Sequence, residues 1–241
     1  MELLKIDGVR KMANATVLNF IEEETHPFFS KKAEFTGYFD IPVIKPTKEI
    51  IEPRQVIHFS RAIYCVDNSM LSDCFICFYE DDGLFMDFLQ HPKKYFPLLR
   101  KAAGIIAPDC SMYFDDPFVL NLIAVYMRNS IASFLQENGF YVVPNVRWGN
   151  EKTYTRGKLP EIVSFEGIPK NAYISIGTYG AVKTREEKEH FKKGLYVMLK
   201  TLTPKKVLVF GAMPDEIFGD KINRDVFIHC KSWTDYVHGG K

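Results

Sequence analysis

"AYISIGTYGAVKTREEKEHFKKGLYVMLKTLTPKKVLVFGA", residues 172–212, joins two short apolar runs through one amphipathic segment. The runs AYISIGT (172–178) and KVLVFGA (206–212) have the composition of strands that are buried on both faces. Between the two runs, apolar residues recur with helical spacing at Phe191, Leu195, Met198 and Leu202. A strand, a helix and a second strand in this order predict parallel strands joined by a helical crossover.

The turn before this helix has the layout at which many proteins bind phosphate: a strand end, glycines and a helix start. However, Thr184 and Glu187 form a T-x-x-E capping box, which predicts a helix that begins at about Arg185. The box satisfies the helix N-terminus without a ligand, and Glu186 and Glu187 would repel a phosphate. We therefore expect this turn to form one wall of a site, with Thr178 facing it, rather than a phosphate cradle.

The same alternation extends over most of the chain. Further strands are predicted in CFICFY (74–79), GIIAP (104–108), FYVVPNV (140–146) and DVFIHC (225–230), and QVIHFSRAIY (55–64) resembles a strand leading into a loop. A long helix is predicted over 117–139, with Pro117 near its start and Gly139 as its C-terminal cap. Residues 81–103 predict one or two short helices, interrupted by Pro92 and Pro97.

This pattern predicts an α/β fold with mostly parallel strands, as an open doubly wound sheet or an incomplete (β/α) barrel. The barrel-like form is favoured because polar residues follow several strands in similar positions. Residues 56–241 are expected to form the α/β domain. Residues 1–55 are expected to form an N-terminal helix in 9–24 and an extended arm, rich in proline, that packs on that domain.

Composition excludes several classes of protein. Apolar residues make up 46% of the chain and charged residues 25%, and 31 basic against 30 acidic side chains give a net charge of +1. That balance argues against a protein that coats nucleic acid or an anionic membrane. The five cysteines lie in or beside apolar stretches, which indicates buried thiols in a reducing compartment. Without a signal peptide or an apolar run of membrane-spanning length, we expect a cytoplasmic protein with no membrane partner.

Candidate functional residues follow the predicted strands, because function collects at the carboxyl ends of parallel strands in both architectures. Candidate catalytic residues are Asp109, Tyr113 and Glu80, of which Asp109 and Glu80 are also candidate ligands for Mg²⁺ or Mn²⁺. Candidate substrate-binding residues are Ser111, Asn145, Arg147, Trp148, Thr178, Tyr179 and Lys183.

Each of these assignments has a structural alternative. Neighbouring acidic residues such as Asp82 and Asp116 fit helix caps and solvated turns as well as metal ligands. Arg147 and Trp148 could grip an anion and stack on a ring, or they could be a solvated arginine beside a tryptophan that closes the core.

Recognised catalytic signatures are absent from the sequence. It contains no G-x-x-x-x-G-K-[ST], G-x-G-x-x-G or G-x-S-x-G motif, which argues against Walker NTPases, dinucleotide enzymes and the usual serine hydrolases. The CFIC run has C-x-x-C spacing, but thiols so spaced in a strand point to opposite faces, and zinc is not expected.

Four stretches carry a resemblance to a known family: APDCSMYFDDP (107–117), VVPNVRWGN (142–150), FEGIPKNAYISIGTYG (165–180) and LTPKKVLVFGAMPDE (202–216). With IPVIKP (41–46) and VIHFSRA (56–62), they resemble an uncharacterised domain family of bacteria, phages and plasmids, over roughly residues 36–216. The resemblance implies a mobile-element setting and brings no known activity. Its pattern includes Asp109, Ser111, Tyr113, Trp148 and Thr178.

Two functional hypotheses follow. The first is an enzyme that acts on a nucleotide or nucleic-acid phosphoester at the strand ends, with a divalent metal as an optional cofactor. The alternative is a non-catalytic binding protein that sequesters a nucleotide signal or inhibits a host defence protein. The near-zero net charge and the absence of a complete catalytic signature favour the alternative.

Overall fold

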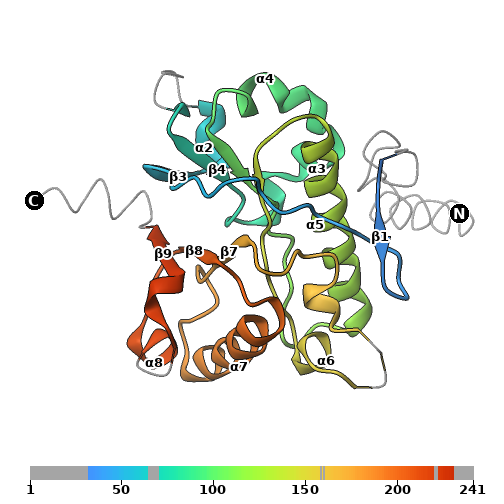
Figure 1. Ribbon diagram of the computed structural model, residues 1–241, viewed down its shortest axis with the longest axis vertical. Helices are drawn as coiled ribbons and strands as arrows, with labels where there is room; N and C mark the ends of the chain where they lie inside the picture. The colour runs from blue at the N-terminus through green and yellow to red at the C-terminus, as the bar shows by residue number, and fades with distance from the viewer. Residues whose placement is uncertain (1–31, 65–70, 158, 160, 220–221, 231–241) are drawn as a thin grey trace, which may run out of the picture.

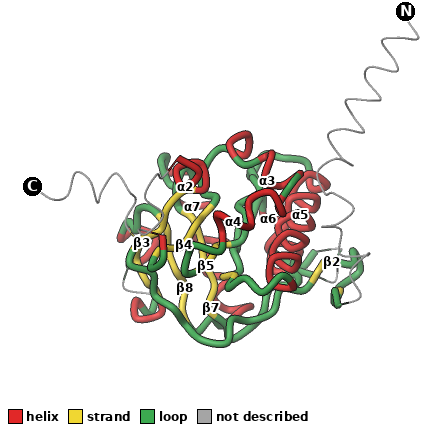
Figure 2. The backbone as a smooth tube through the Cα atoms, turned by 90° about the horizontal axis from the view of Figure 1, so that it is seen from above, coloured by secondary structure: helices red, strands yellow, loops and turns green. Residues whose placement is uncertain are grey.

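The computed structural model describes residues 32–64, 71–157, 159, 161–219 and 222–230 of the 241-residue chain. In this part of the chain, parallel strands form the centre and helices pack around them (Figures 1 and 2). The strands are β3 (Gln55–His58), β4 (Cys74–Cys77), β5 (Gly104–Ile106), β6 (Val142–Val143), β7 (Tyr173–Gly177), β8 (Lys206–Phe210) and β9 (Phe227–Cys230).

The strands follow one another in chain order. Strands β3 to β6 form one parallel ladder and β7 to β9 another. The ladders meet where Asn145 pairs with Ser175, through hydrogen bonds of 2.8 Å from the Ser175 amide to the Pro144 carbonyl and from the Val146 amide to the Ser175 carbonyl. A doubly wound sheet requires a reversal of strand order, which this arrangement lacks. The predicted α/β fold is confirmed in its barrel-like form.

The strands curl around a small core of their own. Val56 of β3 and Cys230 of β9 belong to one buried cluster, although these strands stand at opposite ends of the strand order. Within it the ring of Phe210 stacks on Tyr79 at 5.3 Å between centroids and lies 5.2 Å from the ring of His58. Since no ladder joins β3 to β9 among the described residues, the barrel is incomplete rather than closed.

Side chains alternate between this inner core and a larger outer core beneath the helices. In β4, Cys74 belongs to the outer cluster and Cys77 to the inner one. The two thiols of the CFIC run therefore point to opposite faces, as predicted from the period of a strand.

Helix α5 (Phe118–Glu137) is the long predicted helix and lies along one side of the strands (Figures 1 and 2). It begins after Pro117 and ends before Gly139, whose φ of 80° supplies the left-handed residue of the helix end. In the described part of the chain it is the one helix with the length and composition of a membrane span, and 67% of that window is buried within the protein. Its apolar character is accounted for by packing against the strands.

Helix α7 (Arg185–Leu202) follows β7. The capping box is formed as predicted: the Thr184 hydroxyl accepts from the Glu187 amide at 3.1 Å, and the Glu187 carboxylate accepts from the Thr184 amide at 2.8 Å. Phe191, Leu195 and Met198 are buried along one face of the helix.

Short helices complete the other crossovers: α2 (Phe59–Tyr64), α3 (Met86–Gln90), α4 (Phe96–Leu99), α6 (Glu151–Tyr154) and α8 (Asp215–Phe218). Pro92 and Pro97 lie at the first turns of helical segments, where proline is tolerated. Residues 59–64, predicted to be a loop, are helical. The reason is tertiary: the Glu80 carboxylate, on a different segment, accepts from the Ser60 amide at 2.9 Å in the first turn of α2.

The described part of the N-terminal arm runs across the domain. Its strands β1 (Phe35–Thr36) and β2 (Ile41–Pro42) pair antiparallel and lie beside α5 (Figure 1). The Asn129 amide of α5 donates to the Pro42 carbonyl at 2.9 Å, and Ile41 and Ile44 are buried in the outer core. The helix predicted in 9–24 lies outside the described residues.

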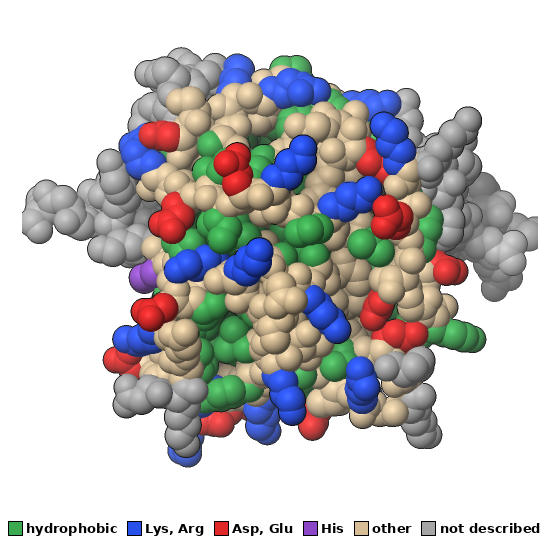
Figure 3. Space-filling model, viewed as in Figure 1, with side chains coloured by type: hydrophobic (Ala, Val, Ile, Leu, Met, Phe, Trp, Pro, Cys, Tyr) green, Lys and Arg blue, Asp and Glu red, His purple; other side chains and the backbone are tan. Residues whose placement is uncertain are grey.

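Charges on the surface are mixed. On the face shown in Figure 3, Lys and Arg side chains occur together with Asp and Glu side chains, and hydrophobic side chains lie between them. This distribution agrees with the net charge of +1.

Candidate functional site

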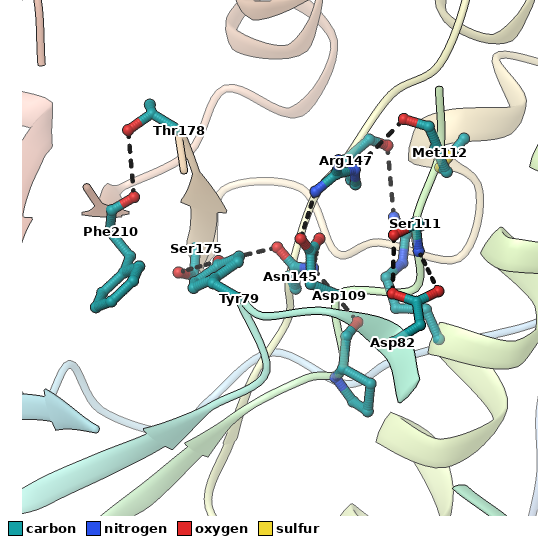
Figure 4. A network of polar contacts seen from close by, with 12 residues as sticks. Tyr79, Asp82, Asp109, Ser111, Met112, Asn145, Arg147, Ser175, Thr178 and Phe210 are labelled. Carbon is teal, nitrogen blue, oxygen red and sulfur yellow. Dashed lines mark hydrogen bonds and ion pairs between the residues drawn. The ribbon is translucent and has the colours of Figure 1, made fainter. Parts of the chain in front are cut away.

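A buried polar network joins the two ladders at the carboxyl ends of the strands (Figure 4). The Tyr79 hydroxyl, beyond β4, donates to Asn145 Oδ1 at 2.9 Å and lies 2.7 Å from the Ser175 hydroxyl of β7. All three side chains are buried. The network therefore fixes the position at which the β3–β6 ladder meets the β7–β9 ladder.

Asp109 extends this network from the loop after β5. Its Oδ1 accepts from the Asn145 amide at 2.8 Å, and its Oδ2 accepts from Arg147 Nη1 at 2.5 Å (Figure 4). Burial alone would lower the pKa of Arg147, but the charge and hydrogen bond of Asp109 raise it. In this pair, the buried carboxylate of Asp109 holds the guanidinium of Arg147 in one orientation.

Arg147 keeps one donor nitrogen for other partners. Its Nε lies 3.5 Å from the Met112 carbonyl and its Nη1 is bound to Asp109. No hydrogen bond found among the described residues uses its Nη2. The side chain is 21% exposed, so it is both anchored and accessible.

A cavity of about 160 Å³ lies beside this arginine, between the loops after β5, β6 and β7 and the first turns of α7. We call it the rim pocket. Its walls include four aromatic side chains, Tyr113, Phe114, Trp148 and Phe191. Its polar side chains are those of Arg147, Glu187 and His190. Trp148 and Phe191 are buried, whereas Tyr113 and Phe114 are exposed.

Trp148 has a structural role as well as a place in the wall. Its ring lies 4.8 Å from Phe191 and 6.4 Å from Phe165, measured between centroids. The structural alternative therefore holds, because Trp148 closes the end of the core. Trp148 also presents part of its surface to the rim pocket, and its stacking on a ligand ring stays a prediction.

Glu187 and His190 line the rim pocket but were not among the candidates from sequence. They stand one helical turn apart on the face of α7 that also carries Phe191, a relation that the spacing alone could have indicated. His190 Nε2 lies 2.6 Å from the Gly149 carbonyl. Because a carbonyl oxygen only accepts, Nε2 carries the hydrogen, and Nδ1 is the acceptor of the neutral ring.

The other candidate residues take positions around the rim pocket. Asn145 and Asp109 lie beneath it in the buried network, and Ser111 donates to Asp82 at 2.8 Å. Thr178 is buried and donates to the Ala212 carbonyl at 2.7 Å, so it ties β7 to the segment after β8. Tyr179 is 64% exposed and Lys183 is exposed, and neither lines the pocket.

The predicted metal ligands are engaged elsewhere. Both oxygens of Glu80 accept from Ser60, one from its amide and one from its hydroxyl, and both oxygens of Asp109 accept from Asn145 and Arg147. In the described ranges no three His, Cys, Asp or Glu side chains are grouped so that they could hold a metal ion. The assignment of Asp109 and Glu80 as ligands of Mg²⁺ or Mn²⁺ therefore stays a prediction, and in this structure both carboxylates are held by donors of the protein.

Beneath the site, Arg128 of α5 is 1% exposed. It donates to the Asn129 side chain at 3.1 Å, to the Ser164 carbonyl at 3.2 Å and to the Arg147 carbonyl at 3.5 Å. Burial lowers its pKa to about 10. The guanidinium fixes the backbone of residue 147 from below.

Comparison with known proteins gives a family and two phage relatives. The family model described as "Domain of unknown function (DUF4417)" matches residues 33–228. The chain is 22% identical over 175 residues to the Gene 1 protein of Mycobacterium phage D29, covering 73% of this chain and 61% of that protein. It is 23% identical over 136 residues to the Gene 1 protein of Mycobacterium phage L5, covering 56% of each.

The chain thus spans about three fifths of the length of these relatives. No solved structure matches it. The expected resemblance to an uncharacterised, phage-associated family is confirmed.

Proposed function

The chain belongs to the DUF4417 family of domains of unknown function, and from that premise we propose that it is a binding protein that takes the base of a nucleotide into the rim pocket. The observation that carries the proposal is Arg147, a guanidinium oriented by buried Asp109, with Nη2 left for a ligand in an aromatic pocket. A pocket of mostly apolar walls with a few placed polar groups is the usual form of a small-molecule site.

The size of the rim pocket suits part of a planar ring system. Its volume is about 160 Å³, close to the roughly 150 Å³ of an engineered apolar cavity that binds benzene. Because the pocket opens to solvent, a base of two fused rings can enter it in part. A whole nucleotide is too large for this space, so the sugar and phosphate lie outside it. Tyr113 and Phe114, which are 54% and 44% exposed, stand where they can contact those outer groups.

The polar groups favour a base over an aromatic side chain of a protein. Three polar side chains, Arg147, Glu187 and His190, share the pocket. A tyrosine or tryptophan side chain has one polar atom and can form a hydrogen bond with only one or two of these groups. A base has several donors and acceptors on its edges and can satisfy all three.

Binding is a better account of the site than catalysis. The candidate catalytic carboxylates, Asp109 and Glu80, use both of their oxygens in hydrogen bonds within the protein. The described thiols are buried, and burial raises their pKa rather than activating them. The hydrolysis of a phosphoester would need a base or a metal ion that these groups do not supply.

The ligand in this proposal is a free nucleotide rather than a long nucleic acid. The net charge is +1, so the chain lacks the basic excess typical of proteins that bind a long phosphate backbone. With phage-encoded relatives, the simplest role is sequestration of a nucleotide in the cytoplasm of an infected cell.

The proposal is tested by calorimetric titration of the full chain with the common nucleosides and their monophosphates. We expect saturable binding of at least one of them, and loss of that binding in Ala181→Leu, which adds bulk to the pocket wall. We expect about tenfold weaker binding in Tyr113→Ala.

Tyr179→Ala is the matched control, because Tyr179 is exposed as Tyr113 is (64% against 54%), lies at the same end of the strands and does not line the pocket. If no nucleoside or nucleotide binds at millimolar concentration, the proposal is overturned, and inhibition of a host protein becomes the hypothesis to examine. Equal losses in Tyr113→Ala and Tyr179→Ala would also overturn the rim pocket as the site.

A further inference from the structure

Resting on the proposed function, we infer that the base recognised in the rim pocket is guanine. The inference comes from counting the hydrogen-bonding atoms that the pocket leaves available. Three charged or ionisable side chains that line the pocket, Arg147, Glu187 and His190, leave one donor and two acceptors unused within the described residues. Guanine is the common base whose pairing edge presents one acceptor and two donors.

Glu187 supplies the first acceptor. Its Oε2 accepts from the amides of Lys183 and Thr184, at 2.9 and 2.8 Å, which fixes the carboxylate at the start of α7. Its Oε1 takes part in no hydrogen bond within the part of the chain that the structure describes. These two amides at the helix start are already used, so a ligand here meets a carboxylate oxygen rather than free N–H groups.

His190 supplies the second acceptor. With Nε2–H donating to the Gly149 carbonyl, Nδ1 of the neutral ring has a free lone pair. The ring is held between Phe114 and Tyr154, each at 5.6 Å between centroids. A ring fixed on both sides keeps this nitrogen in one direction.

Arg147 supplies the donor through Nη2. Its other nitrogens are fixed by Asp109 and the Met112 carbonyl, so the direction of Nη2 is set before a ligand arrives. In the major groove of DNA, an arginine that donates to O6 and N7 is the commonest specific contact with guanine, and the same donor suits O6 of a free base.

The available atoms match one base. Guanine offers O6 as an acceptor for Arg147, and N1–H and the 2-amino group as donors for Glu187 and His190. Cytosine, uracil and thymine offer two acceptors and one donor on this edge, and adenine offers one of each. With any of these, one hydrogen bond fewer forms with the three side chains, which favours guanine over the other bases.

The experiment compares guanosine, inosine and adenosine by calorimetric titration with the full chain. We expect guanosine to bind best, inosine about tenfold more weakly because it lacks the 2-amino group, and adenosine more weakly again. In Glu187→Gln we expect the advantage of guanosine over adenosine to fall about tenfold. Glutamine preserves the capping box, so the variant should fold normally.

Glu186→Gln is the matched control, since Glu186 is the preceding residue, is exposed and does not line the pocket. Equal affinities for guanosine and adenosine would overturn guanine recognition and leave the proposed function intact. An unchanged preference in Glu187→Gln would overturn the assigned role of Glu187. No binding of any nucleoside would overturn the proposed function itself.

Discussion

Trp148 lies over Gly194 so closely that a Cβ added at position 194 would fall 2.2 Å from the indole Nε1 and 2.4 Å from Cδ1. The glycine is in the middle of α7, where it costs the helix stability that alanine would provide. The missing methyl group makes room for the tryptophan that forms a wall of the rim pocket.

Gly194→Ala should therefore destabilise the protein, although alanine is the better helix former. We expect the free energy of unfolding, measured by urea denaturation, to fall by about 1–3 kcal/mol because the indole must move. Lys193→Ala, at the neighbouring exposed position, should change it by less than about 0.5 kcal/mol. A more stable Gly194→Ala variant would contradict the packing described.

The effects of substituting Asp109 and Arg147 on the free energy of unfolding should be strongly coupled. Asp109→Asn and Arg147→Met each leave a buried charge without its partner and should each cost about 3 kcal/mol of unfolding free energy. The double variant should cost clearly less than the sum of the two. The exposed pair Arg54 and Asp73 is the control, because exposed pairs contribute about 1 kcal/mol or less.

His58 should make stability depend on pH. Burial lowers its pKa, Arg61 acts in the same direction, and the charge of Glu80 and the Tyr79 backbone oppose the shift. The unfolded chain therefore binds protons more readily than the native protein once the pH falls below about 6.5. Stability is thus fully present above that pH and is lost as the pH falls toward the lower folded-state pKa.

Urea denaturation at pH 7.5 and pH 5.5 measures this loss. We expect it to shrink in His58→Leu and to persist in His91→Gln, since His91 is exposed. An identical loss in His58→Leu and the unaltered protein would show that other groups cause the dependence.

The described thiols should be inert in the native protein. Burial raises the pKa of Cys74 and Cys230 to about 11, and it raises the pKa of Cys77 and Cys110 as well. Mass spectrometry after brief treatment with iodoacetamide at pH 7.5 should find these four cysteines unmodified until urea unfolds the chain. Lys193→Cys provides an exposed thiol as the positive control, and rapid native alkylation of any of the four would contradict their burial.

The regular elements could be predicted because their periodicity reports burial directly. The strands at 74–77, 173–177 and 206–210 and the helices α5 and α7 each have a local signal, such as an apolar run, a capping box or a glycine beyond the helix end. Helix α2 could not be predicted, because the Ser60 amide in its first turn donates to Glu80, which lies 20 residues further along the chain.

The candidate site could be predicted only in part. Arg147, Trp148 and Tyr113 follow predicted strands and do line the rim pocket, because parallel strands bring their carboxyl ends together. The strand ends also suggested Thr178, whose hydroxyl in fact bonds to a carbonyl after β8. The spacing of Glu187, His190 and Phe191 places them on one face of α7, but which loops that face meets depends on tertiary packing, such as the contact of Trp148 with Gly194.

The unbroken chain order of the strands has a consequence for biosynthesis. Within each ladder every strand pairs with the strand made just before it, and β7 meets the end of the first ladder at the bridge of Asn145 with Ser175, so each β-α unit can dock without waiting for a distant partner. The rim pocket is built entirely from residues between 112 and 191. All of the residues that line the rim pocket are therefore synthesised before β8 and β9, which do not contribute to its walls.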